Sequence, residues 1–205
     1  EMYAVHAKGQ AYPMHEPRLK RGLAIGYALS PTGADHCHSL HDTGLVTATE
    51  DGFNTSARLR GMGVLEPLVL ESLGPEKVRA NIANSTASVM LNCLTMCSMP
   101  GWSVDDLVQM VRAATGWDVT SYELLRLGER ALTMARVVNM RQGLGIDDDR
   151  LGERSYGPTI GGALADGGID REELREAAHT YYAMMGWDRE TGLPTVEKLH
   201  ELGVG

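Results

Sequence analysis

The sequence predicts an all-α fold, an irregular multi-helix domain with long N-terminal loops. The chain has 205 residues, with 11 Met but a single Phe. This bias favours helices, because sheets are usually built from Val, Ile and aromatic residues. Apolar residues recur at helical spacing after residue 66, and no alternating run indicates a strand. We expect one domain over 1–205, with a loop-rich segment at 1–63 and a helical bundle at 64–205.

The helices are predicted from the residues that start them. Pro75 suits the first position of a long helix, and Ser103 and Thr120 each open a capping box. Asp170 caps a later helix in the same way. The expected helices cover 18–29, 75 to about 97, 103–116, 120–143, 170–186 and 195–202. The glycine-rich stretch 143–168 is expected to be an exposed connection.

Each long helix is expected to bury one apolar stripe. On the helix that starts at Pro75, this stripe places Cys93 and Cys97 one turn apart, on or beside the buried face. The predicted stripes are Val78, Ile82, Val89, Cys93 and Met96; Leu107, Met110, Val111 and Ala114; Leu124, Leu127, Ala131, Ala135 and Val138; and Leu174, Ala178, Tyr181 and Met185.

Composition excludes several classes of protein. The net charge of −8 lacks the basic footprint of a nucleic-acid binder. No run of about 18 apolar residues predicts a membrane span, and no leader indicates secretion, so we expect a cytoplasmic protein. Three cysteines form no disulfide framework and are expected to be free, buried thiols. Because the chain opens on Glu1, we expect a fragment of a longer polypeptide.

His6 and Lys8 form a first candidate cluster. In an extended segment their side chains would point the same way. An imidazole that moves a proton and an ammonium that grips an anionic oxygen could then reach one ligand. Surface pairs of this kind are also common without any function.

A second cluster runs from Asn92 to Cys97, at the end of the long helix. A metal or an iron–sulfur cluster would stabilise a thiolate there. Two cysteines cannot hold a four-cysteine cluster, so further ligands would have to come from outside this chain. Inert packing cysteines are the alternative.

Two further segments hold metal-ligating residue types. Asp35-His36-Cys37-His38, followed by His41 and Asp42, has a ligand density typical of metal sites, but its spacing matches no strong zinc motif. The three aspartates at 147–149 lack the calcium-loop pattern. For them the interpretation is a solvated loop.

Four segments, in order along the chain, resemble one family, the aldehyde ferredoxin oxidoreductases. They are HAKGQAYPMHEPR (6–18), GLAIGYALSPTGADHCHSLHDTG (22–44), ATGWDVTSYELLRLGERALTMARVVNMRQG (114–143) and YYAMMGWDRETGLPTVEKLHELG (181–203). The third is the most specific, with Thr115-Gly116-Trp117, Gly128-Glu129-Arg130 and Asn139-x-Arg141-x-Gly143 in family order. The resemblance implies the C-terminal helical domain of such an enzyme, and residues 1–63 would then be its active-site segment.

The resemblance also implies cofactors and residue roles. Family members bind tungsten, sometimes molybdenum, through two pterins, and carry a 4Fe-4S cluster nearby. By this likeness His6 is the catalytic residue beside the metal, which accepts or relays a proton. Lys8, Asn92 and Met96 contact the pterins, Cys97 is the fourth cluster ligand, and Cys93 remains a packing residue. Both cofactors are expected to be absent from the isolated fragment, which should be inactive.

Two residues near Cys97 depart from the family pattern Asp-x-x-Gly-x-Cys. Asn92 replaces the Asp, which removes a charge and adds N–H donors. Thr95 replaces the Gly, where the backbone would approach the cofactor closely. These departures bear on the pterin contacts and hence on the substrate class.

The implied activity is oxidation of an aldehyde to a carboxylic acid, with electrons passed to ferredoxin. The implied partners are the upstream domains of the same polypeptide, ferredoxin or a similar acceptor, and a small aldehyde, and a homodimer is compatible with these. The alternatives are a related enzyme of the benzoyl-coenzyme A reductase type, which acts on thioesters, and a non-catalytic helical interaction domain.

Overall fold

The computed structural model describes residues 5–46, 48–49, 52–53, 60 and 63–204. The described part of the chain forms six α-helices, and its strands are two-residue segments. The all-α prediction is therefore confirmed. The helices are α1 (Arg21–Leu29), α3 (Pro75–Cys93), α4 (Val104–Thr115), α5 (Ser121–Arg141), α6 (Arg171–Met184) and α7 (Val196–Leu202), with 3₁₀ turns η1 (Asp42–Leu45), η2 (Ile146–Asp148) and η3 (Glu153–Tyr156). The strands β1 (His6–Ala7) and β2 (Gln10–Ala11) pair antiparallel, as do β3 (Ala48–Thr49) and β4 (Gly52–Phe53).

Most helix starts agree with the predicted caps. The side chains of Ser103, Thr120 and Asp170 accept hydrogen bonds from the backbone N–H groups three residues on. The first helix begins at Arg21 rather than at Arg18. Arg18 donates from its backbone and its guanidinium to the Glu16 carboxylate, and this local turn delays the helix.

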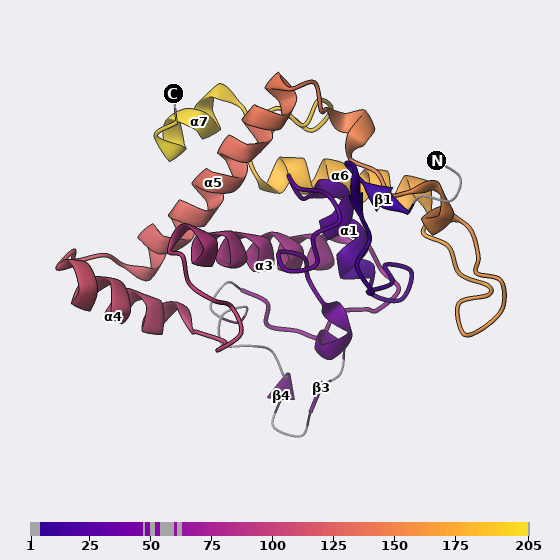
Figure 1. The fold of residues 1–205 in the computed structure, drawn as a ribbon, viewed down its shortest axis with the longest axis horizontal. Helices are drawn as coiled ribbons and strands as arrows, with labels where there is room; N and C mark the ends of the chain where they lie inside the picture. The colour runs from indigo at the N-terminus through magenta and orange to yellow at the C-terminus, as the bar shows by residue number, and fades with distance from the viewer. Residues whose placement is uncertain (1–4, 47, 50–51, 54–59, 61–62, 205) are drawn as a thin grey trace.

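Helix α1 lies at the centre of the fold, between α3 and α6 (Figure 1). Residues 22–29 are all buried, as expected for a helix that is apolar all round. The loop that follows α1 folds back across it. A Cβ on Gly26 would lie 2.2 Å from Ser39 Oγ, so only glycine allows this loop to approach so closely.

A buried polar cluster fixes the register of α1, η1 and α3. The Asp42 carboxylate accepts from Gly22 N at 2.9 Å and pairs with Lys77 Nζ at 2.8 Å. Asn81 Nδ2 donates to the Gly22 carbonyl at 2.8 Å. Buried polar groups are stable only when paired, so these bonds align three segments that are distant in sequence.

The end of α3 differs from the prediction. The helix ends at Cys93, and Thr95 adopts a φ of +56°, so Cys97 lies beyond the helix and not one turn after Cys93. Cys37, Cys93 and Cys97 are free but exposed. The expectation of buried thiols is therefore wrong, and so is the packing role for Cys93.

The predicted stripe of α6 is buried, but those of α4 and α5 are only partly so. Met110 is 36% and Val138 55% exposed, and Ala114 is exposed as well. Helix α4 lies at the edge of the molecule (Figure 1) and packs through Leu107 and Val108. Helix α5 instead buries Gly128 and Leu132, and with them the charged Arg136. Periodicity finds a helix but cannot say how much of its apolar face is covered.

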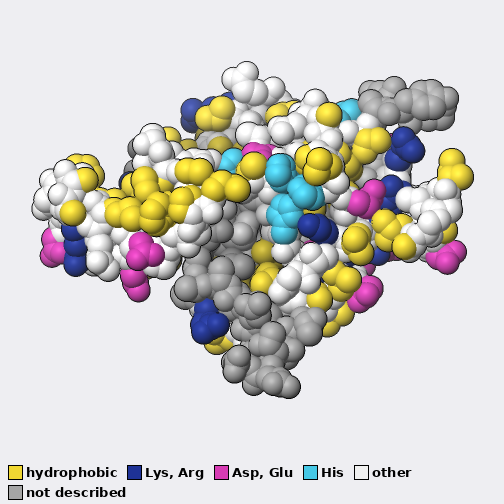
Figure 2. Space-filling model, turned by 60° about the horizontal axis from the view of Figure 1, so that its bottom comes forward, with side chains coloured by type: hydrophobic (Ala, Val, Ile, Leu, Met, Phe, Trp, Pro, Cys, Tyr) yellow, Lys and Arg dark blue, Asp and Glu magenta, His cyan; other side chains and the backbone are white. Residues whose placement is uncertain are grey.

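The surface carries an apolar band. In the view of Figure 2, hydrophobic side chains run from the lobe at the left toward a group of histidines. Large exposed side chains on the described surface include Met99 at 88% and Trp117 at 70%. None of the helices in the described ranges is long and apolar enough to cross a membrane.

The close crossing of α3 and α5 yields a stability prediction. A Cβ on Gly128 would lie 2.2 Å from the Thr86 carbonyl oxygen. Helix propensity alone predicts that Gly128→Ala stabilises by about 1 kcal/mol. We expect the clash to win, so that the free energy of unfolding falls by about 1–3 kcal/mol in urea titration. Gly157→Ala, where the added Cβ meets no atom within 4 Å, is the control; a rise in stability for Gly128→Ala would contradict this packing.

Candidate functional site

Asp149 is the centre of a buried ionic network. Its carboxylate lies 2.8 Å from Lys8 Nζ and 2.7 Å from Arg136 Nη1, and the three side chains are 1%, 2% and 5% exposed. The carboxylate also accepts a hydrogen bond from the Tyr182 hydroxyl. The expected solvated loop at 147–149 is thus wrong for Asp149, although Asp147 is exposed. A lone buried charge is costly, so this network holds the N-terminal hairpin against α5 and α6.

Lys8 lies in the two-residue turn between β1 and β2. Lys8 and Gly9 have φ of +48° and +80°, the signs that a tight hairpin turn requires. The predicted extended segment therefore ends before Lys8. The ammonium donates to Asp149 and to the Ala28 carbonyl, which leaves one of its three N–H groups for another acceptor. Burial lowers the pKa of Lys8, and the Asp149 carboxylate opposes this shift.

A small cavity of about 10 Å³ lies beside this network, lined by Lys8, Arg136 and Trp187 among others. Arg136 Nη2 and Trp187 Nε1 are buried without a hydrogen-bond partner in the described part of the chain. Unpaired buried donors are costly. The wall of this cavity is therefore rich in donors, and its volume suits about one water molecule, which can accept from them.

Asn92 belongs to a chain of polar contacts with the loop after α1. Its amide Nδ2 contacts His38 Nε2, and His38 Nδ1 lies 2.6 Å from the Asp35 carboxylate. A carboxylate only accepts, so Nδ1 carries a proton and Nε2 of the neutral ring accepts from Asn92. Asn92 was predicted from the sequence to contact a cofactor; His38 was not singled out from its neighbours.

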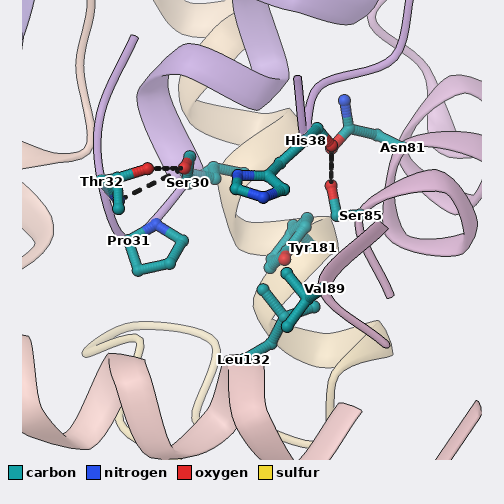
Figure 3. Close-up of a pocket in the computed structure, with 10 residues that line it drawn as sticks. Ser30, Pro31, Thr32, His38, Asn81, Ser85, Val89, Leu132 and Tyr181 are labelled. Atoms are coloured by element: carbon teal, nitrogen blue, oxygen red, sulfur yellow. Dashed lines mark hydrogen bonds between the residues drawn. The ribbon is translucent and has the colours of Figure 1, made fainter. Parts of the chain in front are cut away.

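His38 also lines a larger cavity of about 150 Å³. Figure 3 shows its ring beside Ser30 and above Tyr181, with its carbonyl bonded to the Ser85 hydroxyl at 2.9 Å. This cavity and the small one beside Lys8 share the wall residues Leu29, Ser30, Pro31, Leu132 and Tyr181. The fold therefore places Lys8 and His38 on two sides of one wall, whereas Asn92 lines neither cavity and is linked to this region by its contact with His38.

Met96 and Cys97 follow α3 in an ordered loop. Met96 is half-buried and packs against the apolar cluster of α4 and α5. The Trp102 indole donates to the Cys97 carbonyl at 3.0 Å, while the Cys97 thiol is exposed. The loop thus presents a thiol at the surface on a fixed backbone.

His6 lies in β1 and is half-buried. Its Nδ1 accepts from the Gly9 backbone N–H at 3.3 Å, which places the proton of the neutral ring on Nε2. Of the predicted site residues, His6, Asn92, Met96 and Cys97 line neither of the two cavities that border Lys8 and His38. The structure thus brings Lys8 close to His38, which contacts Asn92, and it does not join His6 or Cys97 to them by a contact.

Arg136, Asp149 and His38 are the site residues that sequence reasoning missed. One signal for Arg136 was available, because it falls four residues after Leu132 on a buried line, where a cation demands a partner. Asp149 carried no such signal, since three adjacent aspartates look alike in sequence.

Comparison with known proteins identifies the family. The family described as "Aldehyde ferredoxin oxidoreductase, domains 2 & 3" matches residues 1–204, and the chain belongs to it. The chain is 27% identical over 206 residues to a tungsten-containing aldehyde ferredoxin oxidoreductase of Pyrococcus horikoshii, and 26% identical over 202 residues to one of Pyrococcus furiosus. These matches cover 98% and 94% of this chain, which spans only 31% and 29% of those relatives.

A solved structure shares the fold. It is the active-site complex BamBC of benzoyl-coenzyme A reductase with 1,5-dienoyl-CoA, at a TM-score of 0.58 and 15% identity. The match covers 95% of this chain and 31% of that one. At this identity the likeness concerns the fold alone.

The donors of this chain suit acceptor atoms of the cofactors that the family implies. A pterin carries such acceptor atoms, and Lys8 has one N–H left for them, although the cavity of about 10 Å³ beside Lys8 has room for no more than about one water molecule. A cluster ligand must present its sulfur to iron, and the Cys97 thiol is exposed. Lys8, Asn92 and Met96 would hold the pterins, and Cys97 would hold one corner of a cluster whose other ligands lie outside this chain.

The ionic network predicts a large effect of one amide substitution. Asp149→Asn keeps the shape but leaves Lys8 and Arg136 as uncompensated buried cations. We expect a loss of about 3–5 kcal/mol in the free energy of unfolding by denaturant titration. Asp147→Asn in the same run is the control, because Asp147 is exposed. Equal effects of the two substitutions would contradict the network.

Thr95 yields a second prediction. Its φ of +56° suits glycine, the residue that the family pattern has there, and is strained for a β-branched side chain. Relief of strain exceeds the entropic cost of glycine, so Thr95→Gly should raise the free energy of unfolding by about 0.5–1 kcal/mol. Thr95→Val retains the branch and should give no gain. Loss of stability with glycine would show that the loop has a different backbone.

Proposed function

We propose that this chain is the C-terminal helical part of an oxidoreductase that oxidises aldehydes to carboxylic acids at a tungsten- or molybdenum-pterin centre. The observation that carries the proposal is that the cavities lined by Lys8 and by His38 share a wall, and that Asn92 contacts His38. The segment of Lys8 resembles a cofactor-binding motif of the family, and the segment of Asn92 resembles a second one with two departures, so their proximity supports a common role. Family membership over residues 1–204 supports the same reading.

The residues of this chain would divide the work as follows. The remaining N–H of Lys8 and the second N–H of the Asn92 amide, the one that does not donate to His38, bind acceptor atoms of the pterins. His6 carries a proton on Nε2 and exchanges it at the substrate, with Nδ1 held by the Gly9 N–H. The bound metallopterin supplies the redox chemistry, which removes two electrons from an aldehyde as water contributes the oxygen. Cys97 would be one ligand of the iron–sulfur cluster that accepts these electrons.

The partners in this proposal are the upstream domains of the same polypeptide, a cytoplasmic ferredoxin or similar acceptor, and a small aldehyde. The chain spans 31% of its Pyrococcus horikoshii relative, which leaves the remaining pterin and cluster ligands to other parts of the protein. The exposed apolar band of Figure 2 suits burial against such domains or in a homodimer.

The role of His6 is tested by His6→Ala in the intact enzyme. We expect turnover of aldehyde to fall about 10²–10⁴-fold, the usual contribution of a positioned general acid or base, with unchanged tungsten, molybdenum and iron content. His200→Ala is a matched control, because His200 is exposed on α7. Near-normal turnover of His6→Ala would refute the role.

The role of Cys97 is tested by iron and sulfide analysis of Cys97→Ala. We expect loss of the 4Fe-4S signal in electron paramagnetic resonance, whereas Cys93→Ala, also an exposed thiol, should retain it. An unchanged cluster in Cys97→Ala would exclude the ligand role.

Dye reduction with aldehydes and with aryl thioesters separates the proposed activity from the thioester reaction suggested by the BamBC-like fold. If analysis of the complete protein found neither metal nor pterin, the remaining interpretation would be a non-catalytic helical interaction domain.

A further inference from the structure

Three histidines from separate segments meet near the surface. His15 precedes α1, His36 follows it, and His41 precedes η1. One ring nitrogen of each lies within 4.8 Å of those of the other two. Their ring centroids are 4.6–5.8 Å apart. All three residues are half-buried, and histidine side chains form a continuous group on the face shown in Figure 2.

The distances suit a single metal ion. Zinc–nitrogen bonds of about 2.0–2.1 Å in a tetrahedral site place the ligand atoms about 3.3 Å apart. The separations of up to 4.8 Å can close by rotation of half-buried rings in loops. Two of the residues come from the Asp35–Asp42 segment, where the sequence already shows ligand types at metal-like density. His15 completes the set only in the folded chain.

Hydrogen bonds fix the tautomer of His41. Its Nε2 lies 3.1 Å from the His36 carbonyl, which can only accept, so Nε2 carries the proton. Its Nδ1 lies 3.2 Å from Lys20 Nζ, which can only donate, so Nδ1 offers its lone pair. A ring that donates one N–H to a backbone carbonyl and offers its other nitrogen has the usual arrangement of a metal-ligating histidine.

The surroundings of His15 and His41 favour the neutral ring, the form that binds metal. Burial lowers the pKa of His15 and of His41, and the nearby Lys20 lowers both further. The alternative is a metal-free stack in which Lys20 permanently caps His41. A stack explains the ring contacts. In the metal-bound alternative the Lys20 ammonium, which lies 3.2 Å from His41 Nδ1, is displaced by the ion.

We propose that His15, His36 and His41 bind one divalent transition-metal ion of the zinc class, with a fourth position open to water. Three imidazoles favour Zn²⁺, Cu²⁺ or Ni²⁺ over Mg²⁺ and Ca²⁺, which prefer oxygen ligands. Lys20 competes with the metal for His41 Nδ1.

The experiment uses the intact protein, with Zn²⁺ as the probe. Zinc per chain is measured by mass spectrometry after dialysis against excess Zn²⁺ and then against metal-free buffer. The coordination shell is measured by zinc X-ray absorption. We expect one zinc per chain in a shell of nitrogen and oxygen with imidazole scattering. His36→Gln and His41→Gln should each weaken binding at least about tenfold, with tungsten, molybdenum and iron content unchanged.

Three controls keep the result decisive. His200→Gln, outside the cluster, should retain zinc. Lys20→Met should bind zinc more tightly than the parent, a gain that no misfolded variant would show. Circular dichroism melts report whether the histidine variants fold. Zinc that persists in the double variant His36→Gln/His41→Gln, a sulfur-containing shell, or no zinc in the parent protein would each overturn the site. The outcome is independent of the proposed function, because pterin metal and cluster iron are counted in the same samples.

Discussion

The buried carboxylate of Asp149 is the constraint on which the site depends. It pairs with two cations that arrive from opposite ends of the sequence, Lys8 from the first hairpin and Arg136 from α5. Neither cation could remain buried without it. The network therefore places the N-terminal segment, and His6 with it, against the helices. Buried donors of Arg136 and Trp187 lie without protein partners beside the network, at a cavity with room for about one water molecule.

A second constraint is the fully buried helix α1. The loops on both of its flanks carry Lys8 and His38, and the helix brings these two residues to a common region. The loop after it crosses back at Gly26 and is anchored through Asp42 to Lys77. The same loop delivers His38 to Asn92 and His36 to His15. One loop thus serves both the proposed cofactor site and the proposed histidine site.

The end of α3 exposes polar and thiol side chains at the surface. Asn92, Cys93 and Cys97 are exposed, although a buried setting was expected for the cysteines. A thiol held on a fixed backbone at the surface is poorly explained by packing within this chain. In the proposed function this thiol is a ligand of a cluster whose other ligands belong to another part of a larger protein; the chain spans 31% of its Pyrococcus horikoshii relative.

Sequence by itself determined the helical class, the family and most helix starts. Caps such as Ser103 and Thr120 act within one turn, and their hydrogen bonds need only local residues. It did not determine which apolar stripes are covered, as Met110 and Val138 show, because coverage depends on where other helices pack. The sequence did not predict that Asp149 is buried while Asp147 is exposed. It also did not predict that His15 lies beside His36 and His41 in the folded chain. Burial of a charge and convergence of ligands are set by contacts between distant segments, and only the tertiary structure decides those.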